Sequence, residues 1–116
     1  MNIFKNLVCV DINRGIREFQ AAEGAVLLDV RSREEYERKH IEHSRSLPLE
    51  ELDRAGKVIP DPDTPVYIYA YGGEQSAKAA VKLEKMGYRN VHNIGGIKKC
   101  CGTQGYHGSY VTCNLM

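Results

Sequence analysis

The segment VYIYAYGGEQSA, residues 66–77, combines the signals of a buried strand, a glycine turn and the start of a helix. Its first four residues are β-branched or aromatic, which favours a strand, and Ser76 is well suited to cap the helix that follows. A segment of this kind places the residue at the strand's end beneath backbone N–H groups of the helix N-terminus, where a nucleophile would be activated. The residue at that point is Ala70, which has no nucleophilic atom.

The helix after this turn is predicted to be amphipathic and to end at Gly87, in the position where glycine is preferred after a helix. Its inward face is expected to carry Ala79, Ala80, Leu83 and Met86, and its outward face Lys78, Lys82, Glu84 and Lys85. We interpret the lysine-rich face as solvated, and steering of an acidic partner is the alternative interpretation.

Strand and helix signals alternate along the rest of the chain. The run AVLLDV at 25–30 is almost continuously apolar, as in a strand buried on both faces of a parallel sheet. Ser32 and Glu35 form a capping box, which predicts a helix over 33–39. Further expected elements are a helix between Asp11 or Asn13 and Gly24, strands over 44–49 and 89–94, a helical turn at 49–52 and a loop over 56–65. This alternation predicts an α/β fold with a central parallel sheet.

Size, charge and composition argue against several classes of protein. The chain has 116 residues, which suits one domain, and its 16 Lys and Arg against 15 Asp and Glu give a net charge of +1. This balance argues against bulk attraction to nucleic acid or to an acidic membrane surface, and no run approaches the ~20 apolar residues of a membrane span. The 4 cysteines match no zinc spacing and are not needed as disulfides, so we expect a reduced, cytoplasmic protein.

Several motifs in a fixed order give the chain a resemblance to a known family. LDVR at 28–31 is followed by Glu35-Tyr36, His40-Ile41, SLPL at 46–49, the turn at 70–76 and NIGGI at 93–97. Over roughly residues 9–99 the chain resembles the rhodanese homology domain of the sulfurtransferase family. The resemblance implies an α/β, rhodanese-like fold with a central, mainly parallel five-stranded sheet flanked by helices on both faces. It assigns a single domain to 1–101 and leaves 102–116 as a C-terminal tail of uncertain structure.

In active members of this family the turn carries a cysteine, a glycine, an arginine and then a hydroxyl residue, which correspond here to Ala70, Gly73, Gln75 and Ser76. The resemblance implies that this cysteine, a thiolate beneath the N–H groups, takes the outer sulfur of a donor and becomes a persulfide. The expected partners are a small anionic sulfur donor such as thiosulfate and a protein or small thiol that accepts the sulfur. No cofactor, metal, nucleic acid or membrane is implied.

This chain departs from the family pattern at three positions of the turn. Ala70 removes the nucleophile, Gln75 removes a cation that would attract the donor, and Glu74 adds a carboxylate. We therefore predict that Ala70 marks the catalytic position and that this chain is inactive. Because an engineered Cys→Ala would leave the other two positions in their usual form, a naturally diverged turn is favoured over a laboratory substitution, and both origins stay open.

The turn is nevertheless expected to keep its backbone shape and some binding capacity. The expected substrate-binding residues are Tyr71, Gly72, Gly73, Glu74, Gln75 and Ser76. Asp29 and Arg31 are expected to support the turn, most simply as an ion pair, and His40 is expected to cap a helix end. Two function classes follow: a sulfurtransferase whose thiol is replaced in this chain, and a natural non-catalytic module that binds an anion or a protein partner.

Three other interpretations are weaker. A phosphatase of the same fold would need one more residue between positions 70 and 75 and both missing side chains. Cys100 and Cys101, beside Lys98 and Lys99, could accept a persulfide as thiols of lowered pKa. A zinc site built from Cys100, Cys101, His107 and Cys113 lacks the usual short gap between paired ligands.

Overall fold

The computed structural model describes residues 12–97 and 111–112, and its centre is a parallel sheet of four strands. The strands are β1 (Val26–Asp29), β3 (Arg45–Ser46), β4 (Val66–Ala70) and β5 (Val91–Gly96), in the order β3-β1-β4-β5. The helices are α1 (Ile12–Ala21), α2 (Arg33–Arg38), α3 (Ala55–Val58) and α4 (Gly73–Lys85), and the 3-10 helix η2 spans Leu49–Arg54. A separate antiparallel pair joins β2 (His40–Ile41) to β6 (Val111–Thr112).

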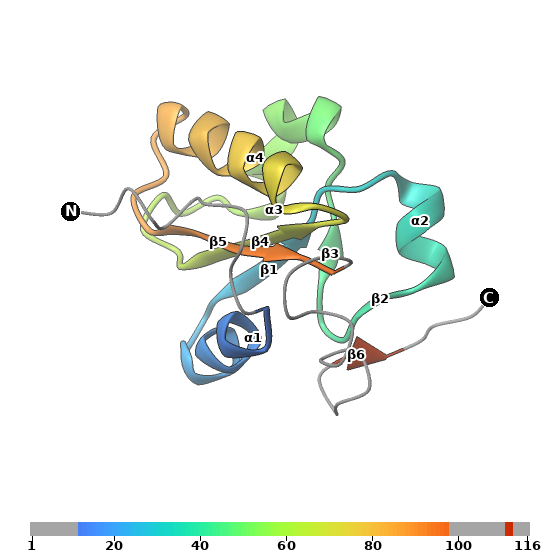
Figure 1. The fold of residues 1–116 in the computed structure, drawn as a ribbon. Helices are drawn as coiled ribbons and strands as arrows, with labels where there is room; N and C mark the ends of the chain where they lie inside the picture. Colours follow the sequence, from blue (N-terminus) through green and yellow to red (C-terminus); the bar gives the residue numbers. More distant parts are fainter. Residues whose placement is uncertain (1–11, 98–110, 113–116) are drawn as a thin grey trace.

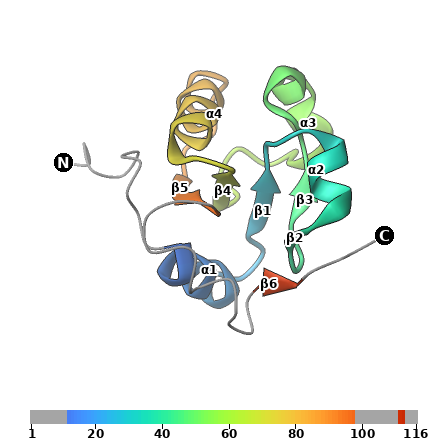
Figure 2. The same ribbon diagram turned by 45° about the vertical axis from the view of Figure 1, so that its right-hand side comes forward.

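Helices cover both faces of the sheet, as the resemblance implies. Figure 1 shows α4 on one side of the strands and α1 on the other, and Figure 2 shows α3 on the same side as α4. The core is correspondingly divided into two buried clusters. The α4-side cluster includes Leu28, Val66, Ile68, Ala70, Ala79 and Leu83, and the α1-side cluster includes Ile12, Ile16, Leu27, Tyr67 and Tyr69. None of the described helices is long and apolar enough to cross a membrane.

Strand β4 shows why the sheet is buried on both faces. All 5 of its residues are buried, and they alternate between the α4-side cluster and the α1-side cluster. This alternation is the two-residue period of a strand, and apolar or aromatic side chains at every position suit a strand covered by helices on both sides. The adjacent residues Tyr69 and Ala70 therefore point to opposite layers of the molecule.

Local signals also set the short elements. The capping box before α2 is confirmed, because the Ser32 side chain accepts the N–H of Glu35 and the Glu35 side chain accepts the N–H of Ser32. Helix η2 contains the helical turn expected at 49–52 and extends to Arg54, and α3 overlaps the first residues of the loop expected over 56–65. Leu52, Ala55 and Ile59 are buried there at helical spacing, so their packing against the sheet outweighs the proline signals that follow.

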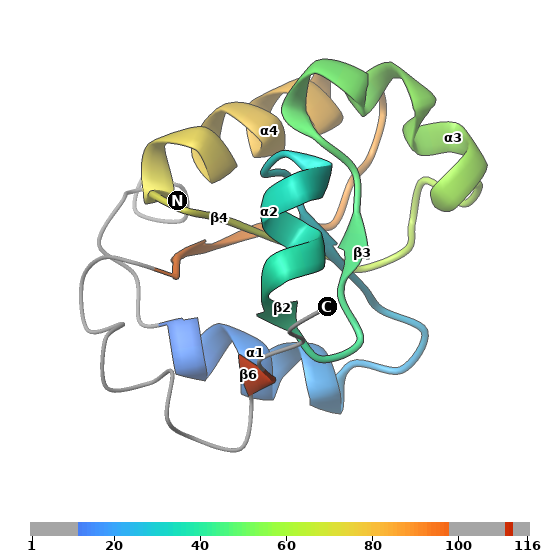
Figure 3. The same ribbon diagram turned by 90° about the vertical axis from the view of Figure 1, so that its right-hand side faces the viewer.

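The strands differ from the expectation in number and extent. Within the described residues the main sheet has four strands, whereas the resemblance implies five, and β2 pairs antiparallel with β6 outside this sheet. Strand β6 belongs to the expected tail at 102–116, so the backbone of that region contributes to pairing at 111–112. Figure 3 shows this pair below α2.

A bulge in β5 shapes the chain beside the end of β4. Ile68 pairs with Asn93 and Tyr69 pairs with Gly95, so one extra residue is inserted on β5 between these two pairs. Gly95 has a φ of 105°, a conformation that glycine adopts without the steric cost of a side chain. The bulge places Gly96 opposite Ala70.

Candidate active site

The turn between β4 and α4 consists of Tyr71 and Gly72 and leads the chain directly into a helix N-terminus. Gly72 is the N-cap residue, with an extended backbone (φ −123°, ψ 154°), and α4 begins at Gly73. The N–H of Gln75 donates to the carbonyl of Gly72 at 3.2 Å. The N–H groups of Gly73 and Glu74 belong to the part of the first turn that has no acceptor within a helix. Together with the positive end of the helix dipole, these donors can bind a small anion.

Ala70 ends β4 immediately before this turn. Its side chain is 0% exposed and packs in the α4-side cluster, while the N–H of Ile97 donates to its carbonyl at 2.8 Å. The sequence predicts a position that presents its side chain to reactants, whereas the structure shows a buried one. The physical reason is that an apolar methyl group gains from packing against the core and has no polar atom that needs solvent.

Ser76 lies inside α4, which corrects its predicted place at the N-cap. The residue is fully buried and its hydroxyl donates to the carbonyl of Gly73 at 3.0 Å. Asn93 of β5 donates from its side-chain amide to the same carbonyl at 3.5 Å and accepts the N–H of Gly95 at 2.9 Å. Asn93 thus ties the first turn of α4 to the bulge in β5. Sequence reasoning counted Asn93 as part of a motif without giving it this role.

Gly96 makes a close backbone contact with the turn. A Cβ at position 96 would lie 2.6 Å from the Cα of Gly72 and 2.6 Å from the carbonyl oxygen of Tyr71. Side-chain carbons do not come this close to backbone atoms, so the contact requires glycine. The Gly95-Gly96 pair therefore serves two purposes, a positive φ in the bulge and a close approach to the turn.

Asp29 and Arg31 form the buried ion pair expected from the sequence. Nη2 of Arg31 lies 2.7 Å from Oδ2 of Asp29, and the Nε and backbone N–H groups of Arg31 donate to the same carboxylate. Nη2 also donates to the carbonyl of Lys39 at 2.5 Å. Burial alone would lower the pKa of Arg31, but the hydrogen bonds and charge of Asp29 raise it. The guanidinium therefore holds the end of β1 to the end of α2 and is not available to an anion in the turn.

Tyr69 connects this ion pair to the strand that carries the turn. Its hydroxyl donates to Oδ2 of Asp29 at 2.6 Å, accepts the N–H of Ile41 at 3.1 Å and lies 3.0 Å from Oγ of Ser44. Burial, followed by the charge of Asp29, raises the pKa of Tyr69 well above its ordinary value. Asp29 thus joins the ion pair to Tyr69, the residue before Ala70. Sequence reasoning assigned Tyr69 to the strand and did not identify its polar contacts or those of Ser44.

The other expected site residues lie at the surface of the first turn of α4. Glu74 and Gln75 are exposed, and Tyr71 is 47% exposed. An acidic side chain in a first helical turn is favourable to the helix dipole, so Glu74 occupies the electrostatic position that an anion would take. At the end of α2, Nδ1 of His40 lies 2.7 Å from the carbonyl of Tyr36, which is the predicted helix-end contact.

The cysteines lie outside the described residues. Cys9, Cys100, Cys101 and Cys113, like His107, fall within 1–11, 98–110 and 113–116. The sulfur-acceptor and zinc interpretations of these residues therefore stay predictions from the sequence.

Comparison with known proteins identifies the family. The model of the rhodanese-like domain matches residues 14–102 of the chain. The chain belongs to the rhodanese-like domain family. Thiosulfate sulfurtransferase PspE of Escherichia coli (strain K12) is 38% identical to this rhodanese-like chain over 72 residues, which cover 61% of the chain and 69% of PspE. The uncharacterized protein YqhL of Bacillus subtilis (strain 168) is 36% identical over 101 residues, which cover 86% of the chain and 75% of YqhL.

Solved structures agree with this assignment. A rhodanese from E. coli, solved with anions, matches the rhodanese-like chain with a TM-score of 0.61 and 36% identity, over 64% of this chain and 88% of that one. The Alr3790 protein from Anabaena sp. matches with a TM-score of 0.74 and 24% identity, over 91% of this chain and 93% of its own, and shows the fold alone. The rhodanese-like fold and the sulfurtransferase family predicted from the sequence are confirmed.

Proposed function

We propose that this rhodanese-like domain is a scaffold for transfer of sulfane sulfur from thiosulfate or a persulfide, and that it is inactive here because residue 70 is alanine. The observation that carries the proposal is the place of Ala70, which ends β4 directly before the N-terminus of α4. The similarity to the thiosulfate sulfurtransferase PspE supports the choice of chemistry.

The proposed reaction requires a thiolate at position 70. The thiolate would attack the outer sulfur of thiosulfate, the S–S bond would break, and sulfite would leave with the bonding electron pair. The resulting persulfide would give its outer sulfur to a nucleophilic acceptor, a thiol or cyanide, and the thiolate would be regenerated. A methyl group can take no part in either step.

The turn supports the binding half of this chemistry. The N–H groups of Gly73 and Glu74 and the dipole of the 13-residue helix α4 favour an anion. The side chains act in the opposite direction, because Glu74 repels an anionic donor and Gln75 supplies no charge. Arg31 does not offset Glu74, since it is paired with Asp29. We therefore expect weak anion binding and no sulfur transfer by the turn.

A natural non-catalytic module that binds an anion or a protein partner is the second candidate. Its support is that residues 70, 74 and 75 all depart from the active pattern, while Asn93 and Gly96 still hold the backbone of the turn. The gene-encoded residue at position 70 separates the two candidates. A cysteine codon supports the enzyme, and an alanine codon supports the module.

Thiosulfate:cyanide sulfurtransferase activity, followed as thiocyanate, tests the predicted inactivity. The unaltered chain should form no thiocyanate above the uncatalysed rate, and the Ala70→Cys variant should form it. The double variant Cys100→Ala/Cys101→Ala is the control for transfer by the C-terminal thiols. Turnover by the unaltered turn that survives this double substitution would contradict the proposal.

A further inference from the structure

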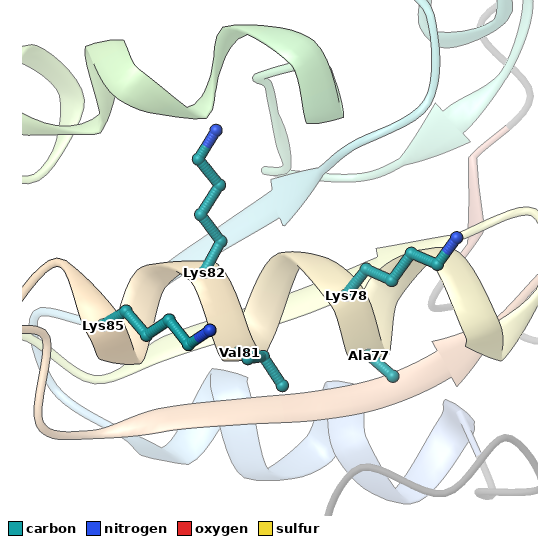
Figure 4. A pocket seen from close by; sticks show the side chains of 5 residues that line it. All are labelled: Ala77, Lys78, Val81, Lys82 and Lys85. Atoms are coloured by element: carbon teal, nitrogen blue, oxygen red, sulfur yellow. The ribbon is translucent and has the colours of Figure 1, made fainter.

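The exposed face of α4 combines three ammonium groups with an apolar floor. A hollow of about 480 Å³ over this helix is lined by Ala77, Lys78, Val81, Lys82 and Lys85. Figure 4 shows these five side chains on α4. Lys78 and Lys85 lie on either side of Val81 along the helix, and Val81 is 43% exposed. An apolar group seated on Val81 would therefore have a cation on each side of it.

The charge of this face is largely uncompensated within the described residues. Lys82 Nζ lies 3.4 Å from Oδ1 of Asp53, but both side chains are substantially exposed, so this pair is weak. Among the described residues, Lys78 and Lys85 have no carboxylate within ion-pair distance. By composition the rest of the chain offers little complement, because residues 1–11 contain a single acidic residue and 98–116 contain none.

We propose that this face of α4 docks a helical segment of a partner protein that carries two carboxylates around one apolar side chain. Lys78 and Lys85 are two helical turns apart, about 10.5 Å along the axis, so glutamates seven residues apart in a partner helix would match them. A leucine between those glutamates would pack on Val81 in the hollow. The face starts one helical turn beyond Glu74 of the site. Resting on the proposed function, the docked protein is the one to which a persulfide at position 70 would pass its sulfur when that residue is cysteine.

Fluorescence anisotropy with the full chain tests the docking. The probe is a labelled model helix with glutamates seven residues apart around a leucine, and the matched peptide has glutamine in place of glutamate. The double variant Lys78→Glu/Lys85→Glu should weaken binding of the glutamate peptide at least about tenfold, because each exposed attraction becomes a repulsion. The apolar contact predicts that Val81→Asp also weakens binding.

The control is Arg14→Glu/Arg17→Glu on α1, which makes the same change in net charge on the opposite face of the sheet. This control should leave binding within about twofold of the unaltered chain. Equal loss in the two double variants, or equally tight binding of the glutamine peptide, would overturn the proposal. Tighter binding of phosphatidylserine vesicles or of polyuridylic acid than of the glutamate peptide would overturn the choice of a protein partner.

The docking proposal and the proposed function fail separately. The anisotropy assay contains no sulfur donor, so absence of peptide binding would overturn the docking and leave the sulfur chemistry standing. Absence of a persulfide in the Ala70→Cys variant would overturn the sulfur chemistry and leave a measured docking surface in place.

Discussion

At the scale of single residues, Gly96 is a position where one added carbon should disturb the site. A Cβ there would meet the backbone of Gly72 and Tyr71 at 2.6 Å, so Gly96→Ala should lower the free energy of unfolding by about 1–3 kcal/mol. Gly56→Ala in α3 is the matched control, since a Cβ there has no neighbour within 4 Å. The control should be neutral or stabilise by up to about 1 kcal/mol. Urea denaturation that finds both variants as stable as the unaltered chain would contradict the close contact.

Tyr69 is the residue at which a single hydroxyl joins several parts of the structure. Tyr69→Phe removes the donor to Asp29 and the acceptor for the N–H of Ile41, both of them buried. Because the N–H of Ile41 then loses its acceptor and Asp29, still paired with Arg31, loses one buried donor, the free energy of unfolding should fall by about 1–3 kcal/mol near neutral pH. A variant of unchanged stability in chemical denaturation would show that the hydroxyl contributes no net stabilisation.

The same residue predicts a change in pH dependence. Burial, and then Asp29, raises the pKa of Tyr69, so above about pH 10 the unfolded chain releases this proton while the folded chain keeps it. The raised pKa of Tyr69 contributes fully to the free energy of unfolding below the ordinary tyrosine pKa, and this contribution is lost as the pH rises above that value. Tyr69→Phe should therefore lose stability less steeply in this range, by up to about 1.4 kcal/mol per pH unit. Burial also raises the pKa values of Tyr67 and Tyr88, so stability should still fall with pH in the Tyr69→Phe variant, but less steeply. The same slope of stability against pH in the variant and the unaltered chain would contradict a raised pKa for Tyr69.

At the scale of elements, the N-terminus of α4 combines a favourable dipole with an unfavourable side chain. In the Ala70→Cys background, Glu74→Gln should speed persulfide formation from thiosulfate, because it removes a negative charge beside the anion's approach. The cost should be about 0.3–1 kcal/mol of helix stability. Glu37→Gln on α2, another exposed glutamate, is the control and should leave the rate unchanged. Equal rates for the Glu74 variant and its parent would show that this carboxylate does not oppose the donor.

Helix α2 depends on its capping box, since none of its residues is buried. Ser32→Ala removes the acceptor for the N–H of Glu35 and should cost about 1 kcal/mol of stability. The loss should be confined to this helix and raise the hydrogen-exchange rates of its amides. Unchanged exchange in α2 would mean that tertiary contacts, and not the cap, hold the helix.

Comparison of elements shows which parts of the fold local sequence signals determine. The cores of β1 and β4, the α2 capping box and the Asp29–Arg31 pair could be predicted, because short-range patterns specify each of them. The start of α4 could not, since two glycines let the chain enter the helix before Ser76, which then hydrogen-bonds within it. The β2–β6 pair joins residues about 70 positions apart, and no local signal encodes such a pairing.

At the scale of the whole molecule, the site lies where the two core layers meet one end of the sheet. Ala70 packs on the α4 side, while its neighbour Tyr69 reaches the ion pair on the α1 side, so both layers fix the end of β4. The bulge in β5 and Asn93 then position the first turn of α4. The burial of Ala70 could not be predicted, because the family pattern describes a thiol and this chain substitutes a methyl group that belongs to the core.

The central claim is that this fold keeps the architecture for persulfide chemistry and lacks its thiol. Intact-mass spectrometry of the unaltered chain and the Ala70→Cys variant, each after thiosulfate treatment, tests it most directly. The account predicts a gain of one sulfur atom on the introduced thiol, located by peptide mapping and reversed by cyanide, and no gain in the β4–α4 turn of the unaltered chain. A folded Ala70→Cys variant that gains no sulfur at position 70 would contradict the claim.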